Sequence, residues 1–415
     1  MNIATVIFTY TRFKHTNLVL EYLKKNTELP EHLIIFQDGI KDTTNINDWK
    51  SVNELINNVD WCPVETYVAS SNKGLSDSII NGITNILKTY DAVIVLEDDC
   101  VPHPQFMEYM RKGLLKYKDY DEVYSINAYD YPLNIEKNGT SAYFTGRIES
   151  WGWGTWKNKW AVFDRDYRLL SKIKKDEELN KRFHNWGEDL ESYLYGNVSG
   201  VCNSWAVFWA LNVIWHRGVC VTPYGSFIDN TGFDGSGVNC GKNNIVQNIR
   251  SFDYFENITF PDHVEFPSNA ELLYRNYWKW TSPQVKLQCY NKTLQNFVPL
   301  ANKGIISNYL IEHKYLKIAI WGKGKLTELF IREIYDDIDV KCIIETSPSV
   351  SEWGEWNLPV VNIDCVTDNL DLIIVIPSYD IDRICLYVKE NLKSYSKLQL
   401  ISLDELLNVC TESLI

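Results

Sequence analysis

Short strand-like runs alternate with helical periodicity over the first 128 residues of the chain. The runs are rich in Val, Ile, Leu and Phe and lie at residues 4–9, 33–36, 64–68 and 92–96. Amphipathic stretches between them predict helices at residues 14–25, 49–58 and 75–87. Because such alternation is typical of a parallel sheet covered by helices, the pattern predicts an α/β fold.

A polar segment follows each of the four strand-like runs. The segments are Thr9-Tyr10-Thr11-Arg12, Gln37-Asp38-Gly39, Ser70-Ser71-Asn72-Lys73-Gly74 and Glu97-Asp98-Asp99. Ligands of open α/β sheets bind beyond the carboxyl ends of the strands. We therefore expect the four segments to converge on one rim of the sheet.

Three consecutive acids, Glu97, Asp98 and Asp99, end the fourth run. Adjacent carboxylates repel one another unless a positive charge lies among them, and a hard divalent cation with oxygen ligands is the usual solution. The acids predict a metal site. The alternative is a solvated strand end, or an N-cap for a helix that begins near Pro104.

Together, Thr9-Tyr10-Thr11-Arg12, Asp38-Gly39, Asn72-Lys73-Gly74-Leu75 and Glu97-Asp98-Asp99 resemble the GT-A glycosyltransferases. The family 2 type and the N-acetylglucosaminyltransferase I type, whose acidic motif is also Glu-Asp-Asp, are the most similar. The resemblance covers about residues 1–260. It implies a mixed GT-A sheet (the nucleotide-diphospho-sugar transferase fold) with flanking helices, a nucleotide-sugar donor and a Mn²⁺ or Mg²⁺ ion.

The resemblance also implies roles for single residues. Thr9 and Arg12 would contact the nucleotide and Asp38 the base edge. Asp98 would contact the ribose and Asp99 the metal. The full set of expected donor-nucleotide residues is Thr9, Arg12, Asp38, Lys73, Glu97 and Asp98. Lys73 or Arg12 could supply a fixed positive charge, and a solvated surface cation is the alternative for each.

An acidic pair, Glu188-Asp189, follows Gly187 at the start of a predicted helix. Inverting family 2 enzymes carry an Asp or Glu near this point that deprotonates the acceptor hydroxyl, a step worth about 10²–10⁴-fold in rate. The resemblance makes Asp189 the expected catalytic base, with Glu188 as the second candidate. Alternatively, both carboxylates only complement the N-terminus of the helix.

Tryptophans alternate with glycines at residues 150–160. Trp151, Trp153 and Trp156 are the expected wall for the donor sugar or the acceptor, because glycines let flat rings approach a ligand. A tight Trp-packed turn in the core is the alternative. The Gly-rich run at residues 230–237 resembles a loop that closes over a nucleotide, and a plain surface loop is equally compatible with it.

The amino-acid composition limits the classes of ligand and partner that the protein could bind. The chain has 415 residues, a net charge of −13 and no dense Lys/Arg stripe, so its field would repel nucleic acid. The 15 Trp and 25 Tyr suit carbohydrate binding, although core packing explains most of them. Ten scattered cysteines without a C-x-x-C pair favour a reducing compartment. We expect no signal peptide, no transmembrane segment and a cytoplasmic location.

A second alternation of strands and helices begins at residue 315. Gly322, Gly324 and Thr327 form a G-x-G-x-x-T sequence, and Glu345 follows the next strand, which approximates a dinucleotide fingerprint. This predicts a smaller Rossmann-like α/β domain for binding, oligomerisation or acceptor docking, or a degenerate scaffold. The expected organisation is a GT-A domain at residues 1–260, a connecting segment at 261–313 and the Rossmann-like domain at 314–415.

The sequence thus predicts a metal-dependent, inverting glycosyltransferase. It would move a hexosyl or N-acetylhexosaminyl group from a nucleotide diphosphate, expected to be UDP, to a hydroxyl of a glycan, glycolipid or glycoprotein in polysaccharide or glycoprotein assembly. A homo-oligomer is compatible with the sequence. Two alternatives stay open, namely a nucleotidyltransferase and a non-catalytic sugar-nucleotide binding protein.

Overall fold

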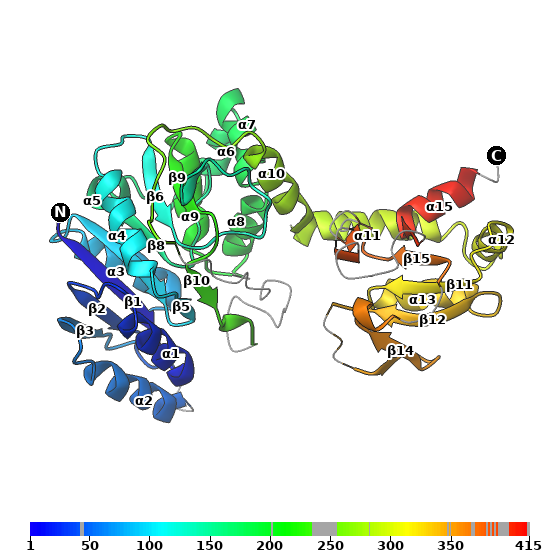
Figure 1. Cartoon of the computed structure of the whole chain (residues 1–415), viewed down its shortest axis with the longest axis horizontal. Coiled ribbons are helices and arrows are strands. Elements are labelled where there is room, and N and C mark those ends of the chain that lie inside the picture. Colours follow the sequence, from blue (N-terminus) through cyan, green and yellow to red (C-terminus); the bar gives the residue numbers. More distant parts are fainter. Residues whose placement is uncertain are drawn as a thin grey trace. The chain divides into compact units, whose positions relative to one another are not determined.

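The computed structural model in Figure 1 divides the chain into two compact units, Met1–Lys279 and Trp280–Ile415. The structure describes residues 1–41, 45–200, 202–234, 255–281, 283–346, 348, 350–366, 370–378, 381, 384–385, 387–388 and 398–412. The division falls within the stretch 261–313 that the sequence suggested as a connecting segment. Both units are α/β, as the sequence predicted.

The first unit contains a mixed eight-stranded sheet with the order β3-β2-β1-β4-β8-β6-β9-β7. Its strands are β1 (Ile3–Thr9), β2 (Leu33–Gln37), β3 (Val64–Val68), β4 (Ala92–Glu97), β6 (Val123–Asn127), β7 (Ala142–Thr145), β8 (Trp153–Trp156) and β9 (Val219–Pro223). The first four are parallel to one another, whereas β8 is antiparallel to both β4 and β6. A separate antiparallel pair joins β5 (Cys100–Pro102) to β10 (Ile228–Asn230).

Helices cover both faces of this sheet. They are α1 (Phe13–Lys24), α2 (Ile46–Asn57), α3 (Leu75–Ile86), α4 (Phe106–Lys116), α5 (Lys157–Trp160), α6 (Leu169–Ile173), α7 (Glu177–Trp186), α8 (Leu190–Val198), α9 (Ala206–Trp215) and α10 (Ala270–Thr281), with a short 3₁₀ helix, η2 (Gly232–Asp234). Along β1, Ile3 and Ile7 pack with α1, α2 and α4, while Val6 and Phe8 pack on the other face with α3 and α9. This period-2 division explains why β1 is apolar at almost every position.

One edge of the sheet collects the polar segments. Because β4 and β6 are both antiparallel to β8, they are parallel to each other, and their carboxyl ends lie at the same edge as those of β1, β2 and β3. We call this the C-terminal edge. The four polar segments that the sequence singled out follow β1, β2, β3 and β4, so all four reach this edge, as expected.

The second unit has a six-stranded sheet with the order β13-β14-β12-β11-β15-β16, parallel except for the β13–β14 pair. Its elements are α11 (Pro283–Phe297), α12 (Ile305–Glu312), β11 (Lys317–Trp321), α13 (Lys325–Ile334), β12 (Asp339–Ile344), β13 (Glu352–Trp353), β14 (Leu358–Val361), η3 (Ile363–Cys365), β15 (Leu372–Val375), β16 (Gln399–Ser402) and α15 (Leu403–Glu412). Glu345 Oε1 accepts a hydrogen bond of 2.7 Å from the Lys323 backbone N–H in the loop between β11 and α13. The Glu345 carboxylate therefore stabilises the loop that contains Gly322 and Gly324. In the part of the chain that the structure describes, no helix is long and apolar enough to cross a membrane.

Asp38 ties two loops of the C-terminal edge together. Its Oδ1 accepts hydrogen bonds from the backbone N–H groups of Gly39 (2.8 Å) and Lys73 (2.9 Å). Its Oδ2 accepts from Asn72 Nδ2 (2.9 Å) and from the Gly74 backbone N–H (2.8 Å). A buried carboxylate with four donors joins the loop after β2 to the loop after β3 and thereby shapes the edge where a ligand would bind.

Replacing Asp38 by Asn should destabilise the first unit. The substituted NH₂ group would face a backbone N–H of Lys73 or Gly74, so at least one hydrogen bond to a charged acceptor is lost. Such a bond is worth about 1.5–3 kcal/mol. We expect a fall of this size in the free energy of unfolding, measured by urea denaturation. The exposed Asp60→Asn is the matched control, and equal stability of the two variants would contradict the role given to Asp38.

Candidate active site

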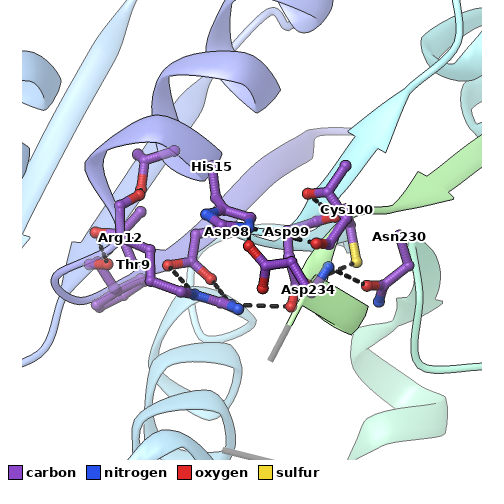
Figure 2. Close-up of polar contacts among 12 residues, drawn as sticks. Thr9, Arg12, His15, Asp98, Asp99, Cys100, Asn230 and Asp234 are labelled. Carbon is purple, nitrogen blue, oxygen red and sulfur yellow. Dashed lines mark hydrogen bonds and ion pairs between the residues drawn. The ribbon is translucent and has the colours of Figure 1, made fainter. Parts of the chain in front are cut away.

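The three consecutive acids lie in a tight turn between β4 and β5. Glu97 ends β4, and Asp98 and Asp99 form the turn before β5 begins. Strand β10 pairs with β5, and the Thr231 backbone N–H donates a hydrogen bond of 2.9 Å to the Asp99 carbonyl oxygen. Gly232 then lies directly against the Asp99 carboxylate, because a Cβ at this glycine would be 2.2 Å from Asp99 Oδ2. Both the backbone and the side chain of Asp99 in this turn are therefore in contact with the segment that follows β10 (Figure 2).

Arg12 lies between the two aspartates of this turn. Its Nη2 forms ion pairs with Asp98 Oδ1 and, at 2.9 Å, with Asp99 Oδ2, and its Nε donates to Asp98 Oδ2 at 3.3 Å (Figure 2). Arg12 Nη1 is buried and has no hydrogen-bond partner among the residues that the structure describes. The guanidinium thus compensates the repulsion within the turn and keeps one donor group unused.

Glu97 sits in a different environment from the two aspartates. Burial, together with the charges of Asp99 and Asp98, raises the pKa of Glu97 to about 8. Trp205, which stacks on Trp153 at 4.9 Å, hydrogen-bonds this side chain. Glu97 consequently binds a proton more readily than an ordinary glutamate and faces the aromatic packing behind the turn.

Two residues that the sequence analysis did not select complete the group. His15 Nε2 lies 3.3 Å from Asp234 Oδ2 and 3.3 Å from the Thr231 carbonyl oxygen (Figure 2). A signal for His15 existed, because it lies in the first turn of α1, three positions after Arg12, the N-cap residue of this helix. Asp234 belongs to the Gly-rich run at 230–237, of which residues 235–237 lie outside the described part of the chain.

The donor set at this turn is chemically suited to a hard divalent ion. Asp99 offers carboxylate oxygens, and its Oδ1 faces only a weak donor in Figure 2, the Cys100 thiol at 3.6 Å. With Asp98 and Asp99 ionised, the pair and Arg12 carry a net charge of −1. The described residues contain no group of three or more His, Cys, Asp or Glu that could hold a metal. However, Mg²⁺ and similar ions often use one or two carboxylates and complete their shell with phosphate and water oxygens.

The remaining expected donor residues have other partners. The Thr9 hydroxyl is buried and donates to the Phe36 carbonyl oxygen at 3.1 Å. The Asp38 carboxylate is engaged by its four donors, and Lys73 contributes its backbone N–H to that network while its side chain is exposed. Thr9 and Asp38 therefore hold the C-terminal edge in shape, and Arg12, Asp98 and Asp99 are the side chains gathered at its centre.

The three tryptophans of the expected sugar wall divide into two groups. Trp153 and Trp156 are only 1% and 3% exposed, so neither offers a face to a ligand, and for these two the core alternative holds. The reason is that β8 lies between β4 and β6, where both faces of the sheet are covered. Trp151 precedes β8 and is half-buried, with its ring 4.5 Å from Tyr129 and 5.5 Å from Phe233.

Asp189 lies in a buried ion pair. Arg147 Nη1 and Nη2 donate to Asp189 Oδ1 and Oδ2 at 2.6 and 2.9 Å, and the aspartate is only 2% exposed. Arg147 also donates to the Trp186 carbonyl oxygen at 3.1 Å and lies 3.6 Å from the centre of the Trp278 ring. Both oxygens of Asp189 are therefore occupied by one guanidinium.

Glu188, the second candidate base, is half-buried beside His184, with Glu188 Oε1 3.4 Å from His184 Nδ1. His184 lies in the last turn of α7 and Glu188 in the turn between α7 and α8, and a contact between such partly exposed side chains is a common surface feature of proteins. The catalytic role expected for Asp189 and Glu188 stays a prediction.

Glu149 is a further buried carboxyl group that the sequence analysis missed. Its backbone N–H donates to Asn127 Oδ1 at 3.1 Å, and the Tyr131 hydroxyl hydrogen-bonds its side chain. Glu149 Oε1 is buried without a hydrogen-bond partner in the described ranges. Burial raises the pKa of Glu149 to about 8, although Arg147 and Tyr131 oppose the shift. Glu149 directly precedes the Trp-rich segment at residues 150–160, and this position was the signal available in the sequence.

Comparisons with known proteins find similarity only in structure. No family model and no curated protein matches the sequence. One similar solved structure is that of residues 1–349 of TarS from S. aureus in complex with UDP-GlcNAc, with 9% identity, a TM-score of 0.32, and coverage of 55% of this chain and 58% of that one. This chain therefore spans less than two thirds of that TarS structure.

Two other similar structures come from different kinds of transferase. The mannosyltransferase PcManGT from Pyrobaculum calidifontis, in complex with GDP-Man and Mn²⁺, has 8% identity and a TM-score of 0.31, covering 52% of this chain and 69% of that one. A cytidylyltransferase from Leptospira borgpetersenii has 12% identity and a TM-score of 0.25, covering 42% and 64%. Similarity of this extent assigns neither a family nor an activity to the chain.

Proposed function

We propose that the first unit is a glycosyltransferase that binds a nucleotide-diphosphate sugar at the C-terminal edge. The observation that carries the proposal is the position of Arg12 between Asp98 and Asp99, with its Nη1 donor unused. A guanidinium with a free donor suits a phosphate oxygen, and carboxylates beside it suit the hydroxyl groups of a ribose. Asp98 is the ribose ligand in this proposal.

Charge also governs how the diphosphate would be held. Two ionised carboxylates and one guanidinium leave an excess of negative charge, which repels a diphosphate unless further positive charge is present. Asp99 would hold a Mn²⁺ or Mg²⁺ ion, which when bound neutralises negative charge on the leaving diphosphate. Arg12 would hydrogen-bond a phosphate oxygen through Nη1 and so keep the leaving group in place.

The chemical step is a transfer to a hydroxyl group. The acceptor oxygen forms a bond to the anomeric carbon, the bond from that carbon to the phosphate oxygen breaks, and the nucleoside diphosphate leaves with the bonding electrons. In this proposal Trp151, which is half-buried at the same edge, contacts a sugar ring. We propose UDP as the nucleotide, inversion at the anomeric carbon, and a glycan, glycolipid or glycoprotein hydroxyl as acceptor, in line with the resemblance of the sequence motifs.

The protein should hydrolyse one class of nucleotide sugar slowly in the presence of Mn²⁺. A screen of UDP-, GDP- and dTDP-sugars, with release of the nucleoside diphosphate as the readout, tests this. EDTA and Asp99→Asn should each abolish hydrolysis, because both remove the positive charge that the diphosphate needs, while Asp60→Asn should keep it. Release of pyrophosphate from a nucleoside triphosphate and a sugar phosphate would instead identify a nucleotidyltransferase. Donor binding without any turnover would identify a non-catalytic binding protein.

Arg12→Gln should weaken the binding of UDP in the presence of Mn²⁺. Loss of a charge-assisted hydrogen bond of about 1.5–3 kcal/mol corresponds to a loss of about 10- to 150-fold in affinity. Isothermal titration calorimetry measures the affinity, and a thermal melt shows whether the variant is folded. Arg168→Gln removes an exposed arginine and serves as the matched control. An unchanged affinity for UDP in the Arg12 variant would contradict the donor site proposed here.

A further inference from the structure

Arg147, Asp189 and Glu149 form a second buried group of charged side chains, and its two carboxylates differ in their partners. Asp189 has both oxygens on the Arg147 guanidinium, at 2.6 and 2.9 Å. The guanidinium takes one acceptor position on each oxygen of Asp189 and so holds this carboxylate in place. Glu149 has the Tyr131 hydroxyl as a donor, while its Oε1 lies buried without a partner in the described residues. A buried carboxylate oxygen without a donor is costly, so its presence calls for an explanation.

The position of Glu149 relates it to the donor site. Its backbone N–H is bound to Asn127, the last residue of β6, so Glu149 lies at the C-terminal edge. Strand β6 is separated from β4, which leads into the acidic turn, by β8 alone. Two residues after Glu149, Trp151 contacts Phe233, and the neighbouring Asp234 pairs with His15 beside the turn. A continuous set of contacts therefore joins the surroundings of Glu149 to those of Asp99.

We propose that Glu149 is the general base of the transfer reaction and accepts, at Oε1, the proton of the acceptor hydroxyl group. This inference rests on the proposed function. In the step, the acceptor oxygen bonds to the anomeric carbon as its proton passes to Glu149, and the nucleoside diphosphate departs with the electrons of the broken carbon–oxygen bond. Asp189 then has a positioning role, because it holds Arg147 beside the base.

The protonation behaviour of Glu149 suits this role. Its raised pKa of about 8 gives the carboxylate a stronger attraction for protons than that of an ordinary glutamate. The base must be ionised to act, so turnover should rise as the pH increases toward and through that value. The charged and titratable groups that act on the pKa of Glu149 are Arg147, Tyr131, Asp189 and Asp130. Of these, Arg147 favours the ionised form of Glu149, whereas Asp189 and Asp130 favour the protonated form. Tyr274 and Cys220 also lie within its electrostatic reach, and Glu149 raises the pKa of both.

A comparison of the reactions with water and with azide distinguishes a general base from a residue that has only a structural role. Water must lose a proton when it attacks the anomeric carbon, whereas the azide ion attacks without losing one and yields a glycosyl azide and the nucleoside diphosphate. The experiment uses the full chain with the nucleotide sugar found by the donor screen, Mn²⁺, and water or sodium azide as the acceptor. Glu149→Gln is compared with the wild type and with Glu122→Gln, an exposed glutamate of the same unit.

For Glu149→Gln, we expect hydrolysis by water to fall by about 10²–10⁴-fold, the usual contribution of a general base. The reaction with azide and the affinity for UDP should stay at wild-type values, and the residual hydrolysis should no longer rise with pH. Glu122→Gln should match the wild type in every measurement. If Glu149→Gln does not fold, Glu149→Asp keeps an ionisable group and should retain the rise of turnover with pH.

Three outcomes would overturn the assignment. Hydrolysis at the wild-type rate in Glu149→Gln excludes a base role for this residue. Equal losses of the water and azide reactions, with UDP affinity intact, mean that Glu149 positions the donor or the fold and carries no proton. A wild-type protein that binds UDP-sugars but hydrolyses none, or binds none, overturns the proposed function and this inference with it, which distinguishes that failure from the other two.

Discussion

The candidate active site depends on how the chain accommodates two adjacent aspartates in one tight turn. Two carboxylates this close repel each other when both are ionised, and Arg12 lies between them and reduces this repulsion. The guanidinium reaches the turn because α1 begins directly after the loop that follows β1, the strand beside β4. Strand β10 fixes the other side, where Gly232 allows its backbone to touch the Asp99 carboxylate. The edge of the sheet is thus shaped by a local electrostatic requirement.

Arg12 and Arg147 both form ion pairs with buried aspartates, but the two ion pairs differ in their net charge. Arg147 has a single bidentate partner, Asp189, and its guanidinium is stacked on Trp278, so this pair is neutral. Arg12 is shared between two carboxylates, which leaves an excess of negative charge. Each guanidinium keeps one buried nitrogen without a partner among the described residues, Nη1 in Arg12 and Nε in Arg147. Buried ion pairs contribute little net stability, because desolvation offsets their attraction. An incompletely compensated pair at a strand end is therefore better explained by a ligand than by a need for stability.

The sequence was sufficient to predict features that depend on residues close together along the chain. Strand periodicity and the polar residues after each strand placed Arg12, Asp98 and Asp99 at one edge, because parallel strands bring their carboxyl ends together. The sequence was insufficient to predict contacts between segments that are far apart along the chain. The burial of Trp153 and Trp156 follows from the insertion of β8 between β4 and β6, which no local pattern encodes. Likewise, Arg147 and Asp189 are 42 positions apart, so the acids at 188 and 189 gave no sign of their partner.

The proposed glycosyl transfer requires opposite electrostatics at the leaving group and at the attacking hydroxyl, and the sheet would separate these two places. A departing diphosphate needs hydrogen-bond donors and positive charge, whereas the attacking hydroxyl needs an acceptor that holds a proton well at neutral pH. Adjacent strands are about 4.8 Å apart, so β4 and β6, with β8 between them, end about 10 Å from each other. The acidic turn after β4 and the Glu149 backbone, whose N–H is bound to Asn127 at the end of β6, therefore lie at the same edge with one strand between them. In the proposed reaction, the antiparallel β8, whose tryptophans are buried, would also be the spacer between the leaving group and the base.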